Sequence, residues 1–119
     1  MLKTLGHMML SAMFIINGFK AFQEPGSRPQ KVAEAGIPAP REATILNGAI
    51  MTVAGTTLAL GIAPKLSALT LIATLIPTTF VGHPYWKETT PQNRANQQIH
   101  FMKNIAMIGG MIAVLVEKD

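Results

Sequence analysis

The chain contains no cysteine and few charged residues. The absence of Cys from its 119 residues excludes disulfide bonds, thiolate catalysis and Cys-ligated zinc or iron–sulfur clusters within the chain. Charged residues make up 13%, whereas an ordinary soluble domain carries about 25%. A chain with so few charges could not easily cover a globule in water.

The charges that are present form no cluster. The net charge of +4 is spread along the chain without a basic run, so nucleic-acid binding has no support. Near the histidines of the second half, Glu42 is the only candidate carboxylate, and no spacing resembles a metal motif. We therefore expect neither a nucleic-acid partner nor a metal site.

Long apolar runs dominate what remains. A bilayer core of ~30 Å needs about 20 helical residues, and four nearly charge-free segments reach about 17–20 residues each with their flanking turns. The sequence predicts an all-α fold, an integral membrane four-helix bundle with up-down-up-down topology, in one transmembrane domain of residues 1–119. A soluble bundle with unusually apolar helices is the alternative. The expected helices cover about residues 4–22, 42–61, 65–82 and 97–116.

The connections between these segments differ in length. The first apolar run is expected to be a retained helix, because Lys20 occupies the place of a small-residue signal-peptide cleavage site. Residues 30–35 favour a short helix capped by Gly36, lying on the membrane surface or over the mouth of the bundle. The turn at residues 61–65 is so short that the helices on either side must be antiparallel neighbours.

Small and hydroxylated residues recur at helical spacing. Glycine and alanine stripes let helix backbones approach closely in lipid. Ser and Thr hydroxyls in lipid bond the carbonyls of their own helix or a neighbour, and a polar pathway is the less favoured interpretation. The small-residue stripes are Gly48, Thr52, Gly55, Thr56, Ala59 and Ala106, Gly109, Gly110, Ala113, and the hydroxyl stripe is Ser67, Thr70, Thr74, Thr78.

Polar side chains gather at one face of the predicted bundle. Ionisable groups at membrane depth usually face the bundle interior or a cavity. Spacings of three and four residues place Lys103 and Asn104 on the same helix face as His100. The alternative is that the lysines snorkel to headgroups and the asparagines only link helices. The candidate ligand-binding residues are Asn17, Lys20, His83, His100, Lys103 and Asn104.

An apolar pocket with these donors suits one class of ligand. His, Lys and Asn converging in an apolar cavity match a lipophilic molecule with carbonyl oxygens, such as a quinone. His83 and His100 could also transfer protons near neutral pH. Tyr85 and Trp86, the only Tyr and Trp of the chain, fit an interfacial aromatic belt. His7, near the opposite end, is expected to be interfacial or packed.

Several motifs resemble a known family. In order, they are INGFKAF, GIPAP, NGAIMTVAGTTLALGI, FVGHPYW and IHFMKNIAMIGG. Their order and spacing are similar to those of the DoxX-like family of small four-helix bacterial membrane proteins. The resemblance implies a multi-pass protein of the bacterial inner (plasma) membrane, linked to membrane oxidoreductase complexes and to quinone-coupled sulfur oxidation. The family pattern falls on the same six candidate residues, although many members have no established activity.

These observations favour a small membrane subunit of a quinone-linked redox complex, with membrane or membrane-associated redox proteins and the bilayer as partners. The chain has no cofactor motif of its own, so the redox ligand is a quinone or belongs to a partner. One alternative is a non-enzymatic assembly or docking subunit, and a less favoured one is a small-solute transporter. The sequence does not decide whether the chain forms a homo-oligomer or whether the chain itself is catalytic. Five Lys and Arg in the two polar loops predict that those loops are cytoplasmic.

Overall fold

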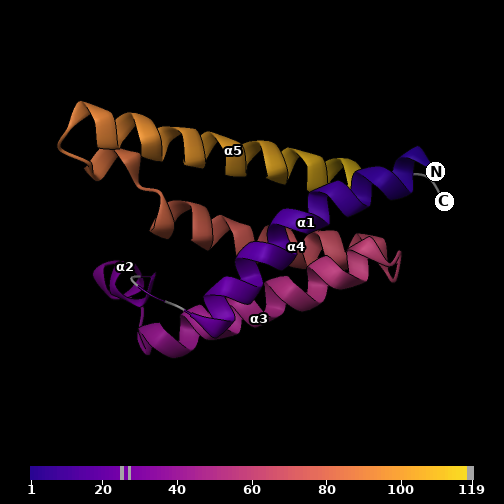
Figure 1. Cartoon of the computed structure of the whole chain (residues 1–119), viewed down its shortest axis with the longest axis horizontal. Coiled ribbons are helices and arrows are strands. Elements are labelled where there is room, and N and C mark those ends of the chain that lie inside the picture. The colour runs from indigo at the N-terminus through magenta and orange to yellow at the C-terminus, as the bar shows by residue number, and fades with distance from the viewer. Residues whose placement is uncertain (25, 27, 118–119) are drawn as a thin grey trace.

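The chain folds into helices. The computed structural model describes residues 1–24, 26 and 28–117, and in this part every regular element is helical, which confirms the all-α class. The elements are α1 (Leu2–Gln23), α2 (Arg28–Glu34), α3 (Pro40–Ala59), α4 (Pro64–Gly82), the 3₁₀ helix η1 (Tyr85–Lys87) and α5 (Pro91–Leu115), as shown in Figure 1.

The start of α5 differs from the sequence prediction. The helix begins at Pro91, well before the expected start near residue 97. The hydroxyl of Thr90 accepts a hydrogen bond from the backbone N–H of Asn93 at 3.2 Å, and Pro91 has no N–H to leave unsatisfied at the first helical position. Apolar periodicity alone missed this polar opening, because its first turns do not belong to the apolar segment.

Three stretches are long and apolar enough to cross a membrane: Leu2–Gln23, Pro64–Lys87 and Pro91–Leu115. Helix α3 is not among them, although it has 20 residues. It carries Arg41, Glu42 and Asn47 in its first half, together with several threonines along its length. The fourth membrane span, and with it the up-down-up-down bundle of four spanning helices, therefore stays a prediction from the sequence.

Glycines bring α1 and α3 into close contact. A Cβ atom at Gly48 would lie 2.6 Å from the carbonyl oxygen of Gly18, and one at Gly18 would lie 2.7 Å from the Cβ of Met51. Neither position has room for a side chain. The predicted small-residue packing is thus confirmed for Gly48, and also for Gly55, where a Cβ would meet Ile15 at 3.0 Å. A Cβ at Gly109, by contrast, would meet no atom within 4 Å.

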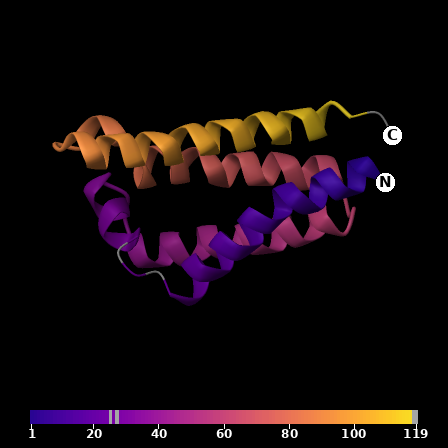
Figure 2. The same ribbon diagram turned by 45° about the horizontal axis from the view of Figure 1, so that its top comes forward.

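The hydrophobic core lies toward the end of the molecule that holds both chain ends. Phe14, Leu58 and Met111 are almost completely buried there. At the same end, the His7 Nε2 lies 2.9 Å from each carboxylate oxygen of Glu117. Toward the other end, α4 and α5 diverge from α1 and α3, and α2 lies at that end (Figure 2). This divergence positions the candidate site.

Candidate functional site

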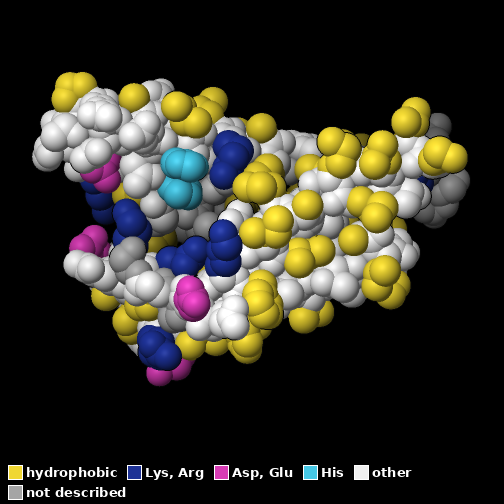
Figure 3. Space-filling model, viewed as in Figure 1, with side chains coloured by type: hydrophobic (Ala, Val, Ile, Leu, Met, Phe, Trp, Pro, Cys, Tyr) yellow, Lys and Arg dark blue, Asp and Glu magenta, His cyan; other side chains and the backbone are white. Residues whose placement is uncertain are grey.

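A cavity of about 760 Å³ occupies the end of the molecule away from the chain ends. Its volume falls in the range of small-molecule sites, roughly 300–1,000 Å³. All five α-helices contribute to its walls, and the space-filling view shows the hollow with Lys, Arg and His side chains around it (Figure 3). Its polar lining residues are Asn17, Arg28, Lys31, Thr44, Asn47, Thr78, His83, Gln97, His100, Lys103 and Asn104.

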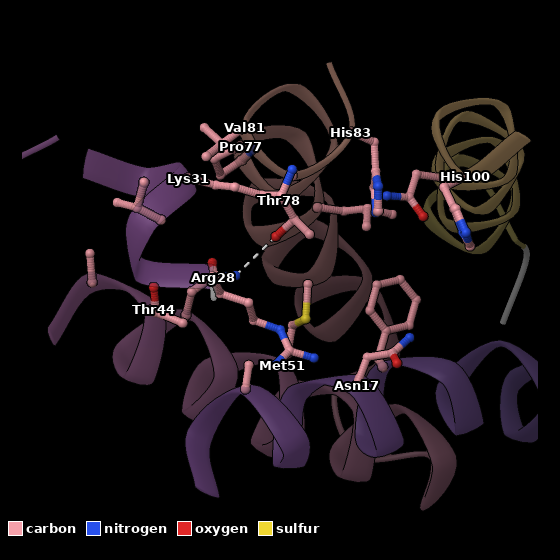
Figure 4. Close-up of a pocket in the computed structure, with 18 of the residues that line it drawn as sticks. Asn17, Arg28, Lys31, Thr44, Met51, Pro77, Thr78, Val81, His83 and His100 are labelled. Atoms are coloured by element: carbon pink, nitrogen blue, oxygen red, sulfur yellow. Dashed lines mark hydrogen bonds between the residues drawn. The ribbon is translucent and has the colours of Figure 1, made fainter. Parts of the chain in front are cut away.

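His83 and His100 form a stacked pair on one wall of this cavity. Their ring centroids lie 5.1 Å apart with an angle of 20° between the planes. Figure 4 shows both rings on one side of the cavity and Arg28, Thr44 and Met51 on the other. The sequence predicted both histidines at one face of the bundle. The structure places their rings together, while α1 and α5 touch only slightly.

Gln97 fixes the tautomer of His83. The His83 Nδ1 lies 2.7 Å from the Gln97 Oε1. An amide oxygen can only accept a hydrogen bond, so Nδ1–H must be the donor. In the neutral ring, Nε2 then carries the lone pair and can accept a hydrogen bond or a proton. Gln97 was not among the predicted site residues, because the expected helix only began there.

Four aromatic rings hold the chain where it passes from α4 to α5. Phe80, Tyr85, Trp86 and Phe101 pack mostly edge to face, with centroid distances between 5.3 and 6.2 Å. Such pairs stabilise a structure by about 0.5–1.5 kcal/mol each beyond burial. The cluster ties η1 to α4 and α5, and it thereby fixes the position of His83. Trp86 keeps 45% of its surface exposed, and its place in a membrane belt stays a prediction.

Asn104 is the most deeply buried polar residue of the cavity wall. It is only 5% exposed, and it makes no hydrogen bond to another side chain in the described part of the chain. None of the described polar side-chain atoms is sealed off without a partner, so the amide of Asn104 keeps its remaining access through the cavity that it lines. A molecule in the cavity can therefore supply the hydrogen bonds that the protein does not.

The remaining predicted residues divide into two groups. Asn17 and Lys103 are exposed and line the cavity. Lys20 is also exposed, but it does not line the cavity.

Two cavity residues of α2 were missed. The sequence interpretation noted residues 30–35 as a helix over the mouth, yet left Arg28 and Lys31 out of the site. Their spacing of three residues on a short helix was the signal that could have identified them.

The hydroxyl stripe of α4 bonds mainly within its own helix. Thr70, Thr74 and Thr78 donate to the carbonyls of Leu66, Leu71 and Thr74 at 2.8–2.9 Å. The favoured sequence interpretation is therefore confirmed. Thr78 has a second role, because its hydroxyl accepts a hydrogen bond from the Asn47 Nδ2 at 3.0 Å and so links α3 to α4 at the cavity wall.

Apolar side chains line the inner part of the cavity, namely Met13, Phe14, Met51, Leu75 and Met107. A second, almost wholly apolar hollow of about 400 Å³ shares Met13 and Met107 with the first and is otherwise lined by Gly6, Met9 and Leu10. The two hollows are lined in part by the same two methionines, and the second lies between α1 and α5. Among the described residues no group of His, Asp or Glu is suited to hold a metal ion.

Comparison with known families identifies the chain's relatives. The family model described as DoxX matches residues 2–84. The chain belongs to the DoxX family. The match covers α1 to α4 and His83, whereas α5, with His100, Lys103 and Asn104, lies outside it. No curated protein and no solved structure matches the chain. This DoxX-family chain is thus a membrane protein with apolar helices, and its candidate site combines matched and unmatched segments.

Proposed function

We propose that this DoxX protein is a multi-pass subunit of a quinone-linked redox complex in the bacterial inner membrane, and that its cavity holds the quinone ring. The observation that carries the proposal is Asn104, a buried amide that bonds no other described side chain and lines a cavity beside an apolar hollow. A quinone offers a carbonyl oxygen to such an amide and an apolar tail to such a hollow.

The histidine wall supports proton transfer at the same ligand. Reduction of a quinone to a quinol takes up two electrons and two protons. The Nε2 of His83, with Gln97 holding the opposite nitrogen as donor, can exchange a proton with a ring oxygen of the ligand. His100, stacked on His83 and exposed, can exchange protons with water. We place the source of the electrons in a redox cofactor of a partner protein, since the sequence offers neither Cys ligands nor a nucleotide-binding motif for a cofactor of its own.

The outer face of α3 supports a fourth membrane span. Leu46, Ile50 and Val53 are 62%, 37% and 64% exposed, and their spacing of three and four residues places them on one face. Soluble monomers rarely expose large contiguous apolar surfaces. In a bilayer this face would contact lipid, and the polar residues of α3 that line the cavity, Thr44 and Asn47, would face inward.

Binding of a short-tailed quinone tests the proposal. The single Trp86 follows His83 closely in the chain and belongs to the aromatic cluster beside it, so quenching of its fluorescence reports a quinone in the cavity. We expect the His83→Ala, His100→Ala double variant to weaken binding at least about tenfold. A quinone oxygen only accepts hydrogen bonds, and the variant removes the N–H donors that His100 and a protonated Nε2 of His83 offer it. Lys20→Gln, outside the cavity, should bind like the wild type. Unchanged binding in the double variant would falsify the proposal.

A further inference from the structure

The cavity is lined by cations and by no acidic residue. Arg28, Lys31 and Lys103 contribute to its walls, and none of the described Asp or Glu residues does. A cavity with one sign of charge raises the local concentration of ligands with the opposite sign. A neutral quinone makes no use of this charge, so the cations require a further explanation.

Helix α2 places two of the cations at the mouth. Arg28 and Lys31 lie three residues apart, and both line the cavity together with Val32 on the same short helix. The helix packs against α3 and α4. The Arg28 Nη1 also donates to the backbone oxygen of Glu24 at 3.1 Å, which holds the guanidinium near the connection from α1. Lys103 comes from α5, which also lines the cavity.

A lipid phosphate can reach cations at this end of the predicted bundle. In the predicted bundle, this end lies at a membrane face, where Lys and Arg reach the headgroup layer. Basic pockets between membrane helices on the cytoplasmic side bind anionic headgroups. The apolar hollow between α1 and α5, which shares Met13 and Met107 with the cavity, offers room for a hydrocarbon chain. A free anion would leave that hollow unused.

We propose that the mouth formed by Arg28, Lys31 and Lys103 binds the phosphate of an anionic phospholipid, with an acyl chain entering the apolar hollow between α1 and α5. This lipid site uses the α2 side of the cavity and Lys103. The site proposed for the quinone ring uses His83 and Asn104. Both proposals use the apolar hollow, so an acyl chain and a quinone tail would exclude each other there. The polar residues of the two sites differ, and the two proposals can therefore fail independently.

Native mass spectrometry of the full chain tests the lipid site. The protein is mixed with equal amounts of phosphatidylglycerol and phosphatidylcholine that carry the same acyl chains. We expect the wild type to retain phosphatidylglycerol preferentially. The Lys31→Gln, Lys103→Gln variant should lose this preference at least about tenfold, because each Lys near a membrane surface contributes roughly a fivefold factor.

Two control variants separate charge at the site from charge in general. Lys87→Gln, Arg94→Gln removes the same charge from exposed positions outside the cavity and should keep the preference. Lys31→Arg, Lys103→Arg keeps the charge and should also keep the preference, which shows that the preference follows the charge at these positions. Equal retention of the two lipids by the wild type, or an equal loss in the Lys87 and Arg94 variant, contradicts the proposal.

Inorganic phosphate serves as a probe that has the phosphate group but no hydrocarbon chain. We expect millimolar phosphate to leave the phosphatidylglycerol adduct in place, since the apolar hollow contributes only to a ligand with a hydrocarbon chain. Displacement of the lipid by phosphate would overturn the lipid assignment and leave a site for small anions. The His83→Ala, His100→Ala variant should keep the lipid preference, so failure of the quinone proposal and failure of this one are distinguishable.

Discussion

Asn104 and His83 have polar atoms that the protein itself leaves available to the cavity. The Nε2 of His83 can accept because Gln97 occupies Nδ1, and Asn104 is buried without a hydrogen bond to another described side chain. Most buried polar groups in proteins bond other protein groups or ordered water. These two available groups therefore indicate a ligand site more strongly than the larger number of polar residues around the cavity does.

Replacing Asn104 separates a ligand-binding role from a structural one. We expect Asn104→Leu to weaken quinone binding at least about tenfold without lowering the free energy of unfolding, because the change breaks no described side-chain hydrogen bond. Chemical unfolding in detergent and Trp86 quenching measure the two effects. Asn47→Leu is the matched control and should lower stability by about 1 kcal/mol, since it breaks the hydrogen bond to Thr78. Loss of stability in Asn104→Leu would show a structural role.

The sequence predicted the individual site residues better than their partners. Spacing placed His100, Lys103 and Asn104 on one helix face, and the structure brings all three to the cavity wall. Gln97 was missed because its role depends on where α5 begins, and that depends on the local cap at Thr90. In α1 the same spacing argument predicted one residue too many. Lys20 lies three residues from Asn17, but only Asn17 lines the cavity.

At the scale of elements, the contact between α1 and α3 determines how the bundle is built. Gly18 and Gly48 remove two side chains from the crossing point, so the two backbones touch. Close packing of this kind drives helix association in lipid, where the hydrophobic effect between helices is absent. The contact between α1 and α5 is much smaller, and an apolar hollow lies between these two helices.

A methyl group at Gly48 tests this crossing. We expect Gly48→Ala to destabilise the protein by about 1–3 kcal/mol, because the added Cβ would lie 2.6 Å from a backbone oxygen that cannot rotate away. Gly109→Ala, where a Cβ meets no atom within 4 Å, should be neutral or slightly stabilising, since Ala is the better helix former. Both are measured by unfolding in detergent. Equal stability of the two variants would contradict the account of the crossing.

Helix ends and helix neighbours differed in how well the sequence predicted them. The Gly36 cap after α2 was predicted and is present, with φ of +82° and a hydrogen bond from the Ile37 N–H to the Val32 carbonyl at 3.3 Å. The separation of α1 from α5 was not predicted. Periodicity shows which face of a helix is apolar, but it does not show which other helix covers that face.

As a whole, the molecule has one closed end and one open end. The closed end contains the core around Phe14 and Leu58, and the His7–Glu117 contact joins α1 to the end of α5 there. His7 was predicted to be interfacial or packed, and it is buried against Glu117. The open end contains the cavity, α2 and the histidine pair. This asymmetry follows the sequence, which concentrates its polar residues at one end of the apolar segments.

The most direct test of the central claim is native mass spectrometry of the protein extracted gently from its own membrane. We expect an adduct with the mass of the membrane's quinone on the wild type. This adduct should be absent from the His83→Ala, His100→Ala variant and retained by Lys20→Gln. A wild-type protein that carries no quinone, or a quinone adduct that persists in the double variant, would contradict the claim that this cavity is a quinone site.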